Sequence, residues 1–442
     1  MDVCVISAGH VGLVTAAVFA DLGNDVTCVD VDRERIGRLK RGAVPIFEPG
    51  LEEMVSRNVA DRRLTFTTDL DLAVRRSQVI FIAVGTPAGP DGETDLGQVE
   101  AAARGIGRAI NGHKVIVNKS TVPVGTGDLV REIVERHAPP GIEFEVVSNP
   151  EFLREGSAIN DTLCPDRIVI GARSRSVAMT LLELYAPLER PMLITDVHSA
   201  EIIKYASNAF LAARVSFINA IADLCEQVGA DVGQVVKGLG YDPRIGAEFL
   251  HPGLGYGGSC LPKDTESLLR TAQERGCDFP LLRAVIEVNR ERVPRFVRRM
   301  EQALGGLADK TIAVLGLAFK PNTDDLREAK AVELVGLLLE RGARVKAYDP
   351  VAMPAARPQL EAAVFCDSAY AAAEDSDALV IATEWNEFKL LNLERLKSVM
   401  RSPVIFDGRN IHAPERMRQL GFVYHSVGRP SAAPESVAGE MR

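Results

Sequence analysis

The order of the first 32 residues constrains the fold more than any other feature of the sequence. Residues 2–7 are apolar and β-branched and predict a strand, and residues 13–23 predict a helix that a glycine closes. Further apolar strands are expected at residues 25–32, 78–85, 114–120 and 144–150. Nearly continuous apolar strands that alternate with helices are typical of a parallel sheet covered on both faces.

The same pattern returns in the last third of the chain. Residues 310–319 predict a strand and turn, residues 329–342 a helix and residues 344–350 a second strand. Later strands are expected at residues 378–385 and 403–410. Residues 199–229 contain no proline and carry glycine only at the end, so they predict one long buried helix. The predicted fold class is α/β, with two Rossmann-like doubly wound domains joined by a long central helix.

Composition and charge exclude several classes of function. The chain of 442 residues has a net charge of −9 and no basic tract, so neither nucleic acid nor an anionic membrane is expected as a partner. No signal peptide and no apolar run of membrane-spanning length is recognised. The seven cysteines include no CxxC pair, which argues against disulfides and against a metal site. We therefore expect a cytoplasmic protein without a metal ion.

The turn after the first strand approximates the GxGxxG fingerprint of a dinucleotide site. Ser7 stands at the first glycine position, while Gly9 allows a pyrophosphate to approach the helix and Gly12 allows close helix–strand packing. Asp30 ends the second strand and is expected to bind a ribose, which favours NAD over NADP. The alternative is a purely structural glycine turn.

Two threonines each follow a predicted strand directly. Thr86 lies in the sequence VGTP and Thr121 in KSTVPVG. Ligands of open α/β sheets bind beyond the carboxyl ends of the strands, so both side chains are expected at the ligand edge. Either threonine alone is equally consistent with a turn residue or a helix cap.

Residues 149–156 (NPEFLREG) predict a short helix with Asn149 as its N-cap and a glycine as its stop. Glu151 and Glu155 would then lie one turn apart on one face. The alternative to a chemical role is a solvated helix face. Lys204 and Asn208 are also four residues apart, on the long apolar helix. A buried lysine needs a partner there, whereas a snorkelling lysine would reach the surface.

Cys260 follows the glycine-rich stretch at residues 253–258 and precedes Lys263 and Asp264. The glycines allow the backbone to approach a ligand, and a nearby cation would favour the thiolate. A thiolate beside a nicotinamide cofactor suggests attack on an aldehyde, followed by oxidation to a thioester that water opens to an acid. The alternative is an incidental cysteine in a glycine-rich loop.

Taken together, the motifs resemble the UDP-glucose/GDP-mannose dehydrogenase family over almost the whole chain. The resemblance rests on these segments in this order: GHVGLVTA, CVDVD, VGTP, NKSTVPVGT, NPEFLREGSAINDTLCPDRIVIG, KYASNAFLAARVSFINA, DPRIG, GYGGSCLPKD, LGLAFKPNTDDLRE and FDGRN. It implies that a sugar-nucleotide C6 alcohol is oxidised to a carboxylate while two NAD are reduced. UDP-glucose is the favoured substrate, and GDP-mannose and UDP-N-acetylmannosamine stay open.

The resemblance also implies roles for single positions. Cys260 would be the nucleophile, and Lys204 and Asp264 would accept the alcohol proton, stabilise the oxyanion and bind water. Glu151 and Thr121 would assist hydrolysis of the thioester, and Asn208 would contact the sugar. The cofactor positions are Gly9, Val11, Gly12, Asp30, Arg35, Thr86, Thr121, Glu155, Lys263 and Arg327. The substrate positions are Glu151, Phe152, Leu153, Lys204, Asn208, Arg244, Phe249, Leu250, Gly253, Gly257, Lys320 and Arg409. Arg244 is expected to reach a neighbouring subunit.

The domains expected on these grounds are an NAD-binding domain at 1–196, a central helical domain with a dimer interface at 197–300, and a nucleotide-sugar-binding domain at 308–428. A disordered tail is expected at 429–442. The long helix is too apolar to face water on most sides, so a homodimer is expected.

Three positions depart from the pattern of the family. Ser7 replaces a glycine, His10 stands where tyrosine is common, and Arg35 replaces a lysine but keeps its charge. The Cβ of Ser7 would cost about 1–3 kcal/mol if the turn needs a glycine-only conformation. Two other functions stay open: a two-electron β-hydroxyacid dehydrogenase, which needs no Cys260, and a catalytically weak nucleotide-sugar-binding protein.

Overall fold

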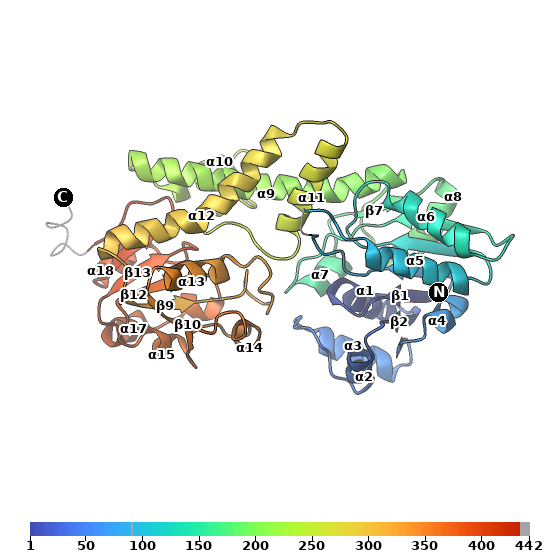
Figure 1. Cartoon of the computed structure of the whole chain (residues 1–442), viewed down its shortest axis with the longest axis horizontal. Helices are drawn as coiled ribbons and strands as arrows, with labels where there is room; N and C mark the ends of the chain where they lie inside the picture. The colour runs from blue at the N-terminus through green and yellow to red at the C-terminus, as the bar shows by residue number, and fades with distance from the viewer. Residues whose placement is uncertain (90–91, 434–442) are drawn as a thin grey trace. The chain divides into compact units, whose positions relative to one another are not determined.

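The computed structural model describes residues 1–89 and 92–433, which divide into two compact units. The units comprise Met1–Ser207 with Glu266–Arg275, and Asn208–Thr265 with the chain from Gly276 onward. Each unit has its own β-sheet, coloured from blue to green in the first and from orange to red in the second (Figure 1). The division between the units passes through two helices, α9 (Val197–Val228) and α11 (Leu261–Glu274).

The first unit contains an eight-stranded sheet in the order β3-β2-β1-β4-β5-β6-β7-β8. Its strands are β1 (Asp2–Ile6), β2 (Asp25–Val29), β3 (Leu64–Thr67), β4 (Val79–Ile82), β5 (Lys114–Asn118), β6 (Phe144–Ser148), β7 (Ile168–Gly171) and β8 (Met192–Thr195). The first six strands pair in parallel, and all of them except β3 coincide with strands that the sequence predicts.

The last two strands of this sheet correct the prediction of a wholly parallel sheet. β7 lies antiparallel to β6, with Ser148 opposite Gly171, and β8 then follows β7 in parallel. Between β6 and β7 the chain carries only the short helix α7 (Ala158–Leu163). An antiparallel neighbour needs no long helical crossover, so this short connection suffices.

Apolar side chains cover both faces of the first sheet, because successive residues of a buried strand point to opposite sides. Val3 and Val5 of β1 belong to one apolar cluster, and Cys4 and Ile6 belong to another. The remaining helices of this unit are α1 (His10–Asp21), α2 (Arg33–Lys40), α3 (Leu51–Ala60), α4 (Leu70–Arg76), α5 (Gly97–Ala109), α6 (Thr126–His137) and α8 (Arg175–Tyr185).

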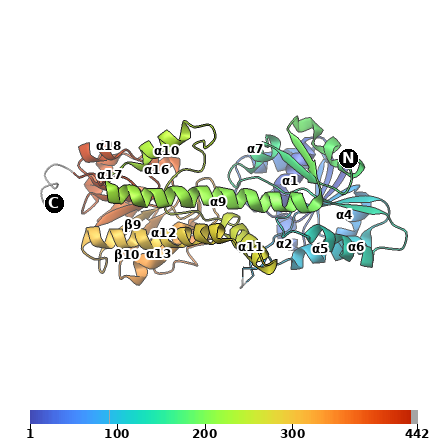
Figure 2. The same cartoon turned by 90° about the horizontal axis from the view of Figure 1, so that it is seen from above.

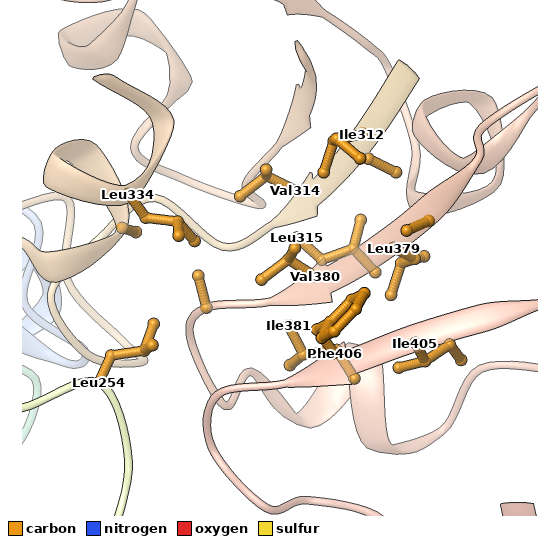
Figure 3. Packing of buried hydrophobic residues seen from close by; sticks show 14 of the residues in the cluster. Leu254, Ile312, Val314, Leu315, Leu334, Leu379, Val380, Ile381, Ile405 and Phe406 are labelled. Carbon is orange, nitrogen blue, oxygen red and sulfur yellow. The ribbon is translucent and has the colours of Figure 1, made fainter. Parts of the chain in front are cut away.

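The second unit contains a six-stranded parallel sheet in the order β11-β10-β9-β12-β13-β14. The strands are β9 (Thr311–Leu315), β10 (Arg344–Tyr348), β11 (Val364–Phe365), β12 (Ala378–Ile381), β13 (Val404–Asp407) and β14 (Val423–Ser426). Its core includes Val314, Val380 and Phe406, and Leu254 from the glycine-rich stretch packs into the same cluster (Figure 3).

The helices of the second unit surround this core. They are α10 (Val232–Gly240), α12 (Pro280–Leu304), α13 (Lys330–Glu340), α14 (Met353–Ala356), α15 (Ala369–Ala373), α16 (Asn386–Lys389), α17 (Leu393–Val399) and α18 (Pro414–Gln419). The order of strands and helices confirms the prediction of a second doubly wound, Rossmann-like sheet.

Helix α9 is one unbroken helix of 32 residues (Figure 2), within two residues of the predicted start. In the described part of the chain it is the one helix long and apolar enough to cross a membrane. About 44% of its most apolar window is buried inside the structure, and core helices often pass the same test, so this is weak support for a membrane segment.

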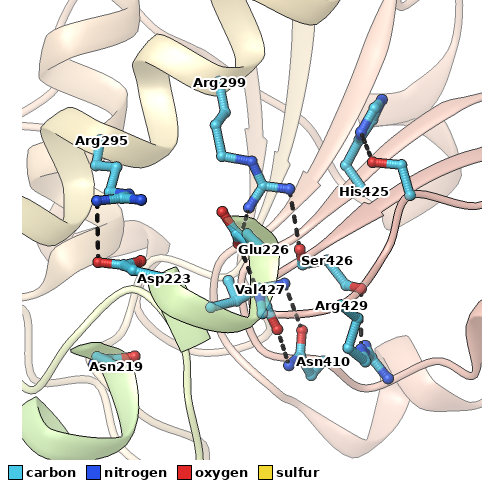
Figure 4. Close-up of polar contacts among 12 residues, drawn as sticks. Asn219, Asp223, Glu226, Arg295, Arg299, Asn410, His425, Ser426, Val427 and Arg429 are labelled. Atoms are coloured by element: carbon cyan, nitrogen blue, oxygen red, sulfur yellow. Dashed lines mark hydrogen bonds and ion pairs between the residues drawn. The ribbon is translucent and has the colours of Figure 1, made fainter. Parts of the chain in front are cut away.

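Ion pairs fix the last turns of α9 within the second unit (Figure 4). The carboxylate of Asp223 pairs with Arg292 and Arg295 of α12. Glu226 pairs with Arg299, whose guanidinium also donates to the Ser426 carbonyl at 3.1 Å. The Gly428 N–H donates to Glu226 at 2.8 Å, so one carboxylate joins α9, α12 and the chain after β14.

The start of the predicted disordered tail is paired with the sheet. Ala432 and Tyr424 exchange backbone hydrogen bonds of 2.7 and 3.0 Å. The Ser431 hydroxyl also contacts the His425 ring nitrogen at 2.9 Å. The expectation of disorder is therefore wrong for residues 429–432, because this segment satisfies the backbone groups of β14, and residues 434–442 lie outside the described residues.

We predict that Glu226→Ala lowers the free energy of unfolding of the second unit by about 3 kcal/mol, because Arg299 loses its carboxylate partner. The single tryptophan, Trp385, is buried in this unit, so urea unfolding followed by its fluorescence reports the loss. Glu291→Ala is the matched control, since Glu291 and its partner Arg298 are both more than half exposed. This control should change stability by less than about 0.5 kcal/mol, and an equal effect of the two variants would contradict the prediction.

Candidate active site

The turn between β1 and α1 has the geometry of a dinucleotide site. A Cβ on Gly12 would lie 2.1 Å from the Ser7 carbonyl oxygen, so only glycine fits there. A Cβ on Gly9 would meet only the Ser7 hydroxyl, at 3.3 Å, which leaves the other side of the turn open for a phosphate. Asp30 accepts a hydrogen bond from Ala8 N–H at 2.7 Å. Asp30 also accepts one from Arg35 at 3.1 Å, so its carboxylate stands fixed beside the turn.

Ser7 adopts a backbone φ of 101°, in the region that favours glycine. Its hydroxyl accepts a hydrogen bond from the Gly9 N–H at 3.1 Å. The serine therefore strains the turn and also occupies one of the N–H groups at the start of α1. Both effects act where a cofactor pyrophosphate would bind.

Thr86 and Thr121 lie together at the carboxyl edge of the first sheet, as predicted. The Thr86 hydroxyl donates to the Thr121 carbonyl at 2.8 Å. The strands that precede them, β4 and β5, are parallel neighbours. Val11, the remaining cofactor position in this turn, is half-buried in the first turn of α1.

The predicted helix over residues 149–156 is wrong, because this segment is irregular and α7 begins only at Ala158. The Asn149 side chain does not cap a helix. Its oxygen accepts from Lys119 at 3.0 Å and from Tyr185 at 2.6 Å, and its amide donates to the Val169 carbonyl at 2.8 Å. Tertiary hydrogen bonds thus outcompete the local capping signal.

Glu48 holds the end of this segment, and the sequence analysis missed it. Its buried carboxylate accepts from Gly156 N–H at 2.7 Å and Ala158 N–H at 2.8 Å, and it contacts His10 at 2.8 Å. His10, which departs from the family pattern, thereby supports the loop. Glu155 is not one helical turn from Glu151, since no helix forms there.

Glu151 and Lys204 form a buried ion pair in the first unit. The Oε1 atom of Glu151 lies 2.9 Å from the Nζ of Lys204, and the two side chains are only 6% and 5% exposed. The second oxygen of Glu151 accepts from Leu153 N–H at 2.8 Å. The ring of Phe152 lies beneath the ammonium, with 5.4 Å from Nζ to the ring centroid. Lys204 is thus buried with a partner and does not snorkel, and the pair can hold and transfer a proton.

Cys260 directly precedes α11 in the second unit. Its carbonyl accepts from Asp264 N–H at 2.9 Å, which closes the first turn of the helix. The thiol is exposed, and Ser259 Oγ lies 3.5 Å from its sulfur. Because the helix dipole favours negative charge at this end, the position suits a thiolate nucleophile.

Asp264 follows Cys260 by one helical turn and is only 1% exposed. Its carboxylate accepts from the Asn208 amide at 2.6 Å and from Lys263 at 2.6 Å. Asn208 belongs to the part of α9 that lies in the second unit, so this unit holds its own charged cluster.

The glycines before Cys260 allow the chain to approach itself. A Cβ on Gly257 would lie 2.2 Å from the Glu328 carbonyl, and one on Gly253 would lie 2.7 Å from the Gly408 carbonyl. The sequence predicts that these glycines leave room for a ligand. The structure gives them a packing reason, which fixes the loop that precedes the thiol.

The remaining predicted substrate and cofactor positions of the second unit lie on loops. Arg409 donates to the carbonyls of Ala382 at 2.8 Å and Phe319 at 3.4 Å, and the Lys320 ammonium lies 5.3 Å from the Phe319 ring. These two basic residues therefore share one neighbour. Other positions have these surroundings: Arg327 pairs with Asp325, Arg244 pairs with Asp242 and is exposed, Leu250 is buried, and Phe249 has a φ of 60°.

Two more buried charged residues escaped the sequence analysis. Lys119, directly after β5, is buried, and desolvation lowers its pKa to about 8. Glu201 on α9 accepts from Gly125 N–H and Gly127 N–H, each at 2.7 Å, and burial raises its pKa to about 7. Lys119 stands two residues before Thr121, and this closeness to a predicted site residue is the feature of the sequence that points to Lys119.

Comparisons with known proteins agree over nearly the whole chain. Three models of the UDP-glucose/GDP-mannose dehydrogenase family match: the NAD binding domain at 1–189, the central domain at 198–291 and the UDP binding domain at 313–414. The chain is 51% identical to UDP-glucose 6-dehydrogenase TuaD of Bacillus subtilis, over 97% of this chain and 93% of that one. It is also 51% identical to UDP-glucose 6-dehydrogenase of Rhizobium meliloti, over 97% and 100%.

A solved structure supports the same assignment. The UDP-glucose dehydrogenase of Pyrobaculum islandicum matches with a TM-score of 0.91 and 42% identity, over 97% of this chain and 98% of that one. Fold and full-length similarity agree, and the chain belongs to the UDP-glucose/GDP-mannose dehydrogenase family.

Proposed function

We propose that this protein is an NAD-dependent UDP-glucose 6-dehydrogenase, which converts the C6 alcohol of UDP-glucose to the carboxylate of UDP-glucuronate. The exposed thiol of Cys260 at the start of α11, one turn before the buried Asp264, carries the proposal. A two-electron dehydrogenase needs no such thiol. The full-length identity to UDP-glucose 6-dehydrogenases favours UDP-glucose over GDP-mannose or UDP-N-acetylmannosamine as substrate.

The residues of the β1–α1 turn suit NAD. Gly9 and Gly12 allow the pyrophosphate to approach α1, Asp30 would accept from a ribose hydroxyl, and Thr86 and Thr121 line the same sheet edge. Arg35, Glu155, Lys263 and Arg327 are further proposed contacts. NAD, when bound, accepts one hydride in each of the two oxidations.

Lys204 and Asp264 serve the first oxidation in this proposal. Hydride leaves C6 as the alcohol loses its proton to one of these groups, and the product is an aldehyde. The Lys204 ammonium, held by Glu151, stabilises the developing oxyanion, and the Asn208 amide binds a sugar hydroxyl.

Cys260 serves the second oxidation. Its sulfur adds to the aldehyde carbon to form a thiohemiacetal, and loss of a second hydride gives a thioester. Water then attacks the thioester carbonyl, the C–S bond breaks, and the thiolate and the sugar carboxylate are released. Glu151 takes a proton from that water, and Thr121 assists it. The balance is two NAD reduced and one water consumed per sugar.

The nucleotide is assigned to the third family domain, which is described as UDP binding. The proposed contacts are Lys320 and Arg409, together with Phe249, Leu250, Gly253 and Gly257 of the segment before Cys260. Phe152 and Leu153 extend the sugar site in the first unit. A catalytically weak nucleotide-sugar-binding protein is disfavoured, because all the residues that the proposed chemistry needs are present, with Glu151, Lys204 and Asp264 buried and the Cys260 thiol exposed.

A homodimer in the cytoplasm completes the proposal. Four large apolar side chains of α9 in the second unit recur along one stripe and are more than half exposed: Phe210, Phe217, Leu224 and Val228. An exposed apolar stripe of this kind marks a protein interface. Arg244 is exposed, which is compatible with a contact across that interface.

We predict that Cys260→Ser lowers kcat by more than about 100-fold while UDP-glucose and NAD still bind, because a serine hydroxyl is a poor nucleophile without a dedicated base. Cys277→Ser is the control, since Cys277 is also exposed and has no proposed role. The parent enzyme should give two NADH per UDP-glucose. The mechanism would be contradicted if the parent gave one NADH and free aldehyde as the end product. It would also be contradicted if the kcat of the serine variant lay within a few-fold of the kcat of the parent.

We predict that Ser7→Gly stabilises the protein by about 1 kcal/mol and tightens NAD binding, because it relieves the positive φ and frees the Gly9 N–H. Thermal unfolding and calorimetric titration with NAD measure the two effects, and UDP-glucose affinity should not change. Asp309→Gly also sits at a positive φ, of 63°, and should leave NAD affinity unchanged. An unaltered NAD affinity in Ser7→Gly would show that serine fits this turn.

We predict a dimer in light scattering at micromolar concentration that Phe217→Glu converts to monomer, because the charge falls in the exposed stripe of α9. Leu390→Glu is the control, since Leu390 is 83% exposed and lies outside the stripe. A monomeric parent, or dissociation by both variants alike, would refute the interface.

A further inference from the structure

Lys119 is a buried charged residue that none of the roles above uses. It follows β5 directly and is only 7% exposed. Its ammonium donates to the Asn149 side-chain oxygen at 3.0 Å and to the Tyr185 hydroxyl at 3.2 Å. Burying an ammonium group costs free energy, so a lysine at this position needs a physical explanation.

Hydrogen bonding alone does not require a charge at this position. The Tyr185 hydroxyl already donates to the Asn149 oxygen at 2.6 Å, and the Asn149 amide donates to the Val169 carbonyl at 2.8 Å. Without Lys119 neither Asn149 nor Tyr185 would be left with an unpaired buried group. A neutral side chain of similar size would therefore suffice for structure alone.

Lys119 places a positive charge in the wall of a cavity that Glu151 also lines. Lys119 and Glu151 line the same cavity of about 40 Å³, which has room for a water molecule. Thr15 of α1 also lines it, and its buried hydroxyl has no hydrogen-bond partner among the described residues, as expected if a water sits there. The titratable and charged groups around the ammonium are Glu151, Lys204, Tyr185, Asp161 and Arg167.

The pKa of Lys119 reflects the same surroundings. Desolvation lowers it to about 8, the carboxylate of Glu151 acts in the opposite direction, and the ammonium of Lys204 lowers it further. Glu151 therefore has two cations near it: Lys204 in direct contact, and Lys119 in the lining of the same cavity. Lys204 is proposed to exchange a proton in the oxidation steps, whereas Lys119 is held apart by Asn149 and Tyr185.

We propose that Lys119 is a positioning residue for thioester hydrolysis, whose positive charge attracts and orients the Glu151 carboxylate whichever protonation state Lys204 holds. The inference rests on the proposed role of Glu151 as acceptor of the water proton. In that step water gives one proton to the Glu151 carboxylate, its oxygen bonds to the thioester carbon, and the Cys260 C–S bond breaks. Lys119 touches none of the reacting atoms.

Lys119→Met and Lys119→Gln test this inference in the full-length enzyme. Both remove the charge, and glutamine keeps a donor for Asn149. We expect a rapid release of two NADH per active site, followed by steady turnover about 10- to 100-fold slower than in the parent. Intact-mass spectrometry should show the thioester accumulating on Cys260.

Stability separates this role from a structural one. The pKa of Lys119 lies below its value of 10.5 in an unfolded chain, so below pH 8 its charge opposes folding. Lys119→Met should therefore melt at or above the temperature of the parent at pH 7. Lys114→Met is the matched control, because Lys114 is also 7% exposed and lies at the opposite end of β5, where it donates to backbone carbonyls. This control should turn over normally without accumulating thioester.

The inference is overturned if either Lys119 variant turns over like the parent, or is slowed without accumulating thioester. A Lys119→Gln variant with the turnover of the parent would assign Lys119 a structural role. Loss of the first rapid NADH release in either variant would do the same. If the proposed function itself is wrong, the parent enzyme will release no NADH when it is given UDP-glucose and NAD.

Discussion

The buried pair of Glu151 and Lys204 is the interaction on which the chemistry proposed for the first unit depends. Removing two charges from water costs several kcal/mol for each ion, and good geometry must offset it. The 2.9 Å contact and the Leu153 N–H provide that geometry. Residues 149–156 carry Glu151 to this pair along an irregular path, because the Asn149 side chain bonds Lys119, Tyr185 and the Val169 carbonyl instead of capping a helix.

Two long helices connect the chemistry of the two units along the chain. Helix α9 carries Lys204 in the first unit and Asn208, one turn later, in the second. Helix α11 begins beside Cys260 in the second unit and continues from Glu266 in the first. Each unit thus receives charged groups from a helix that it shares with the other, while its own sheet supplies the loops.

Sequence patterns predicted the repeated strands and helices because buried parallel strands are continuously apolar. They missed β3, β7 and β8 of the first sheet and β11 and β14 of the second, and the reversal of β7 leaves no local signal. Cys260, Lys204 and Asp264 were recognisable from their motifs. Lys119 and Glu48 were not, since their importance lies in partners that are between 30 and 110 residues away in the chain. The helix predicted after Asn149 does not form, because the capping signal is local whereas the partners of the Asn149 side chain are distant in the sequence.

The pairing of Ala432 with Tyr424 has a consequence for the outer edge of the second sheet. β14 is the last strand of that sheet, and an open last strand offers unpaired N–H and C=O groups to any other extended chain. By exchanging both backbone hydrogen bonds with Tyr424, Ala432 covers part of that edge. The start of the C-terminal segment thereby opposes edge-to-edge aggregation. A chain shortened before Ala432 would expose the backbone groups of β14, to which a strand of another molecule can pair.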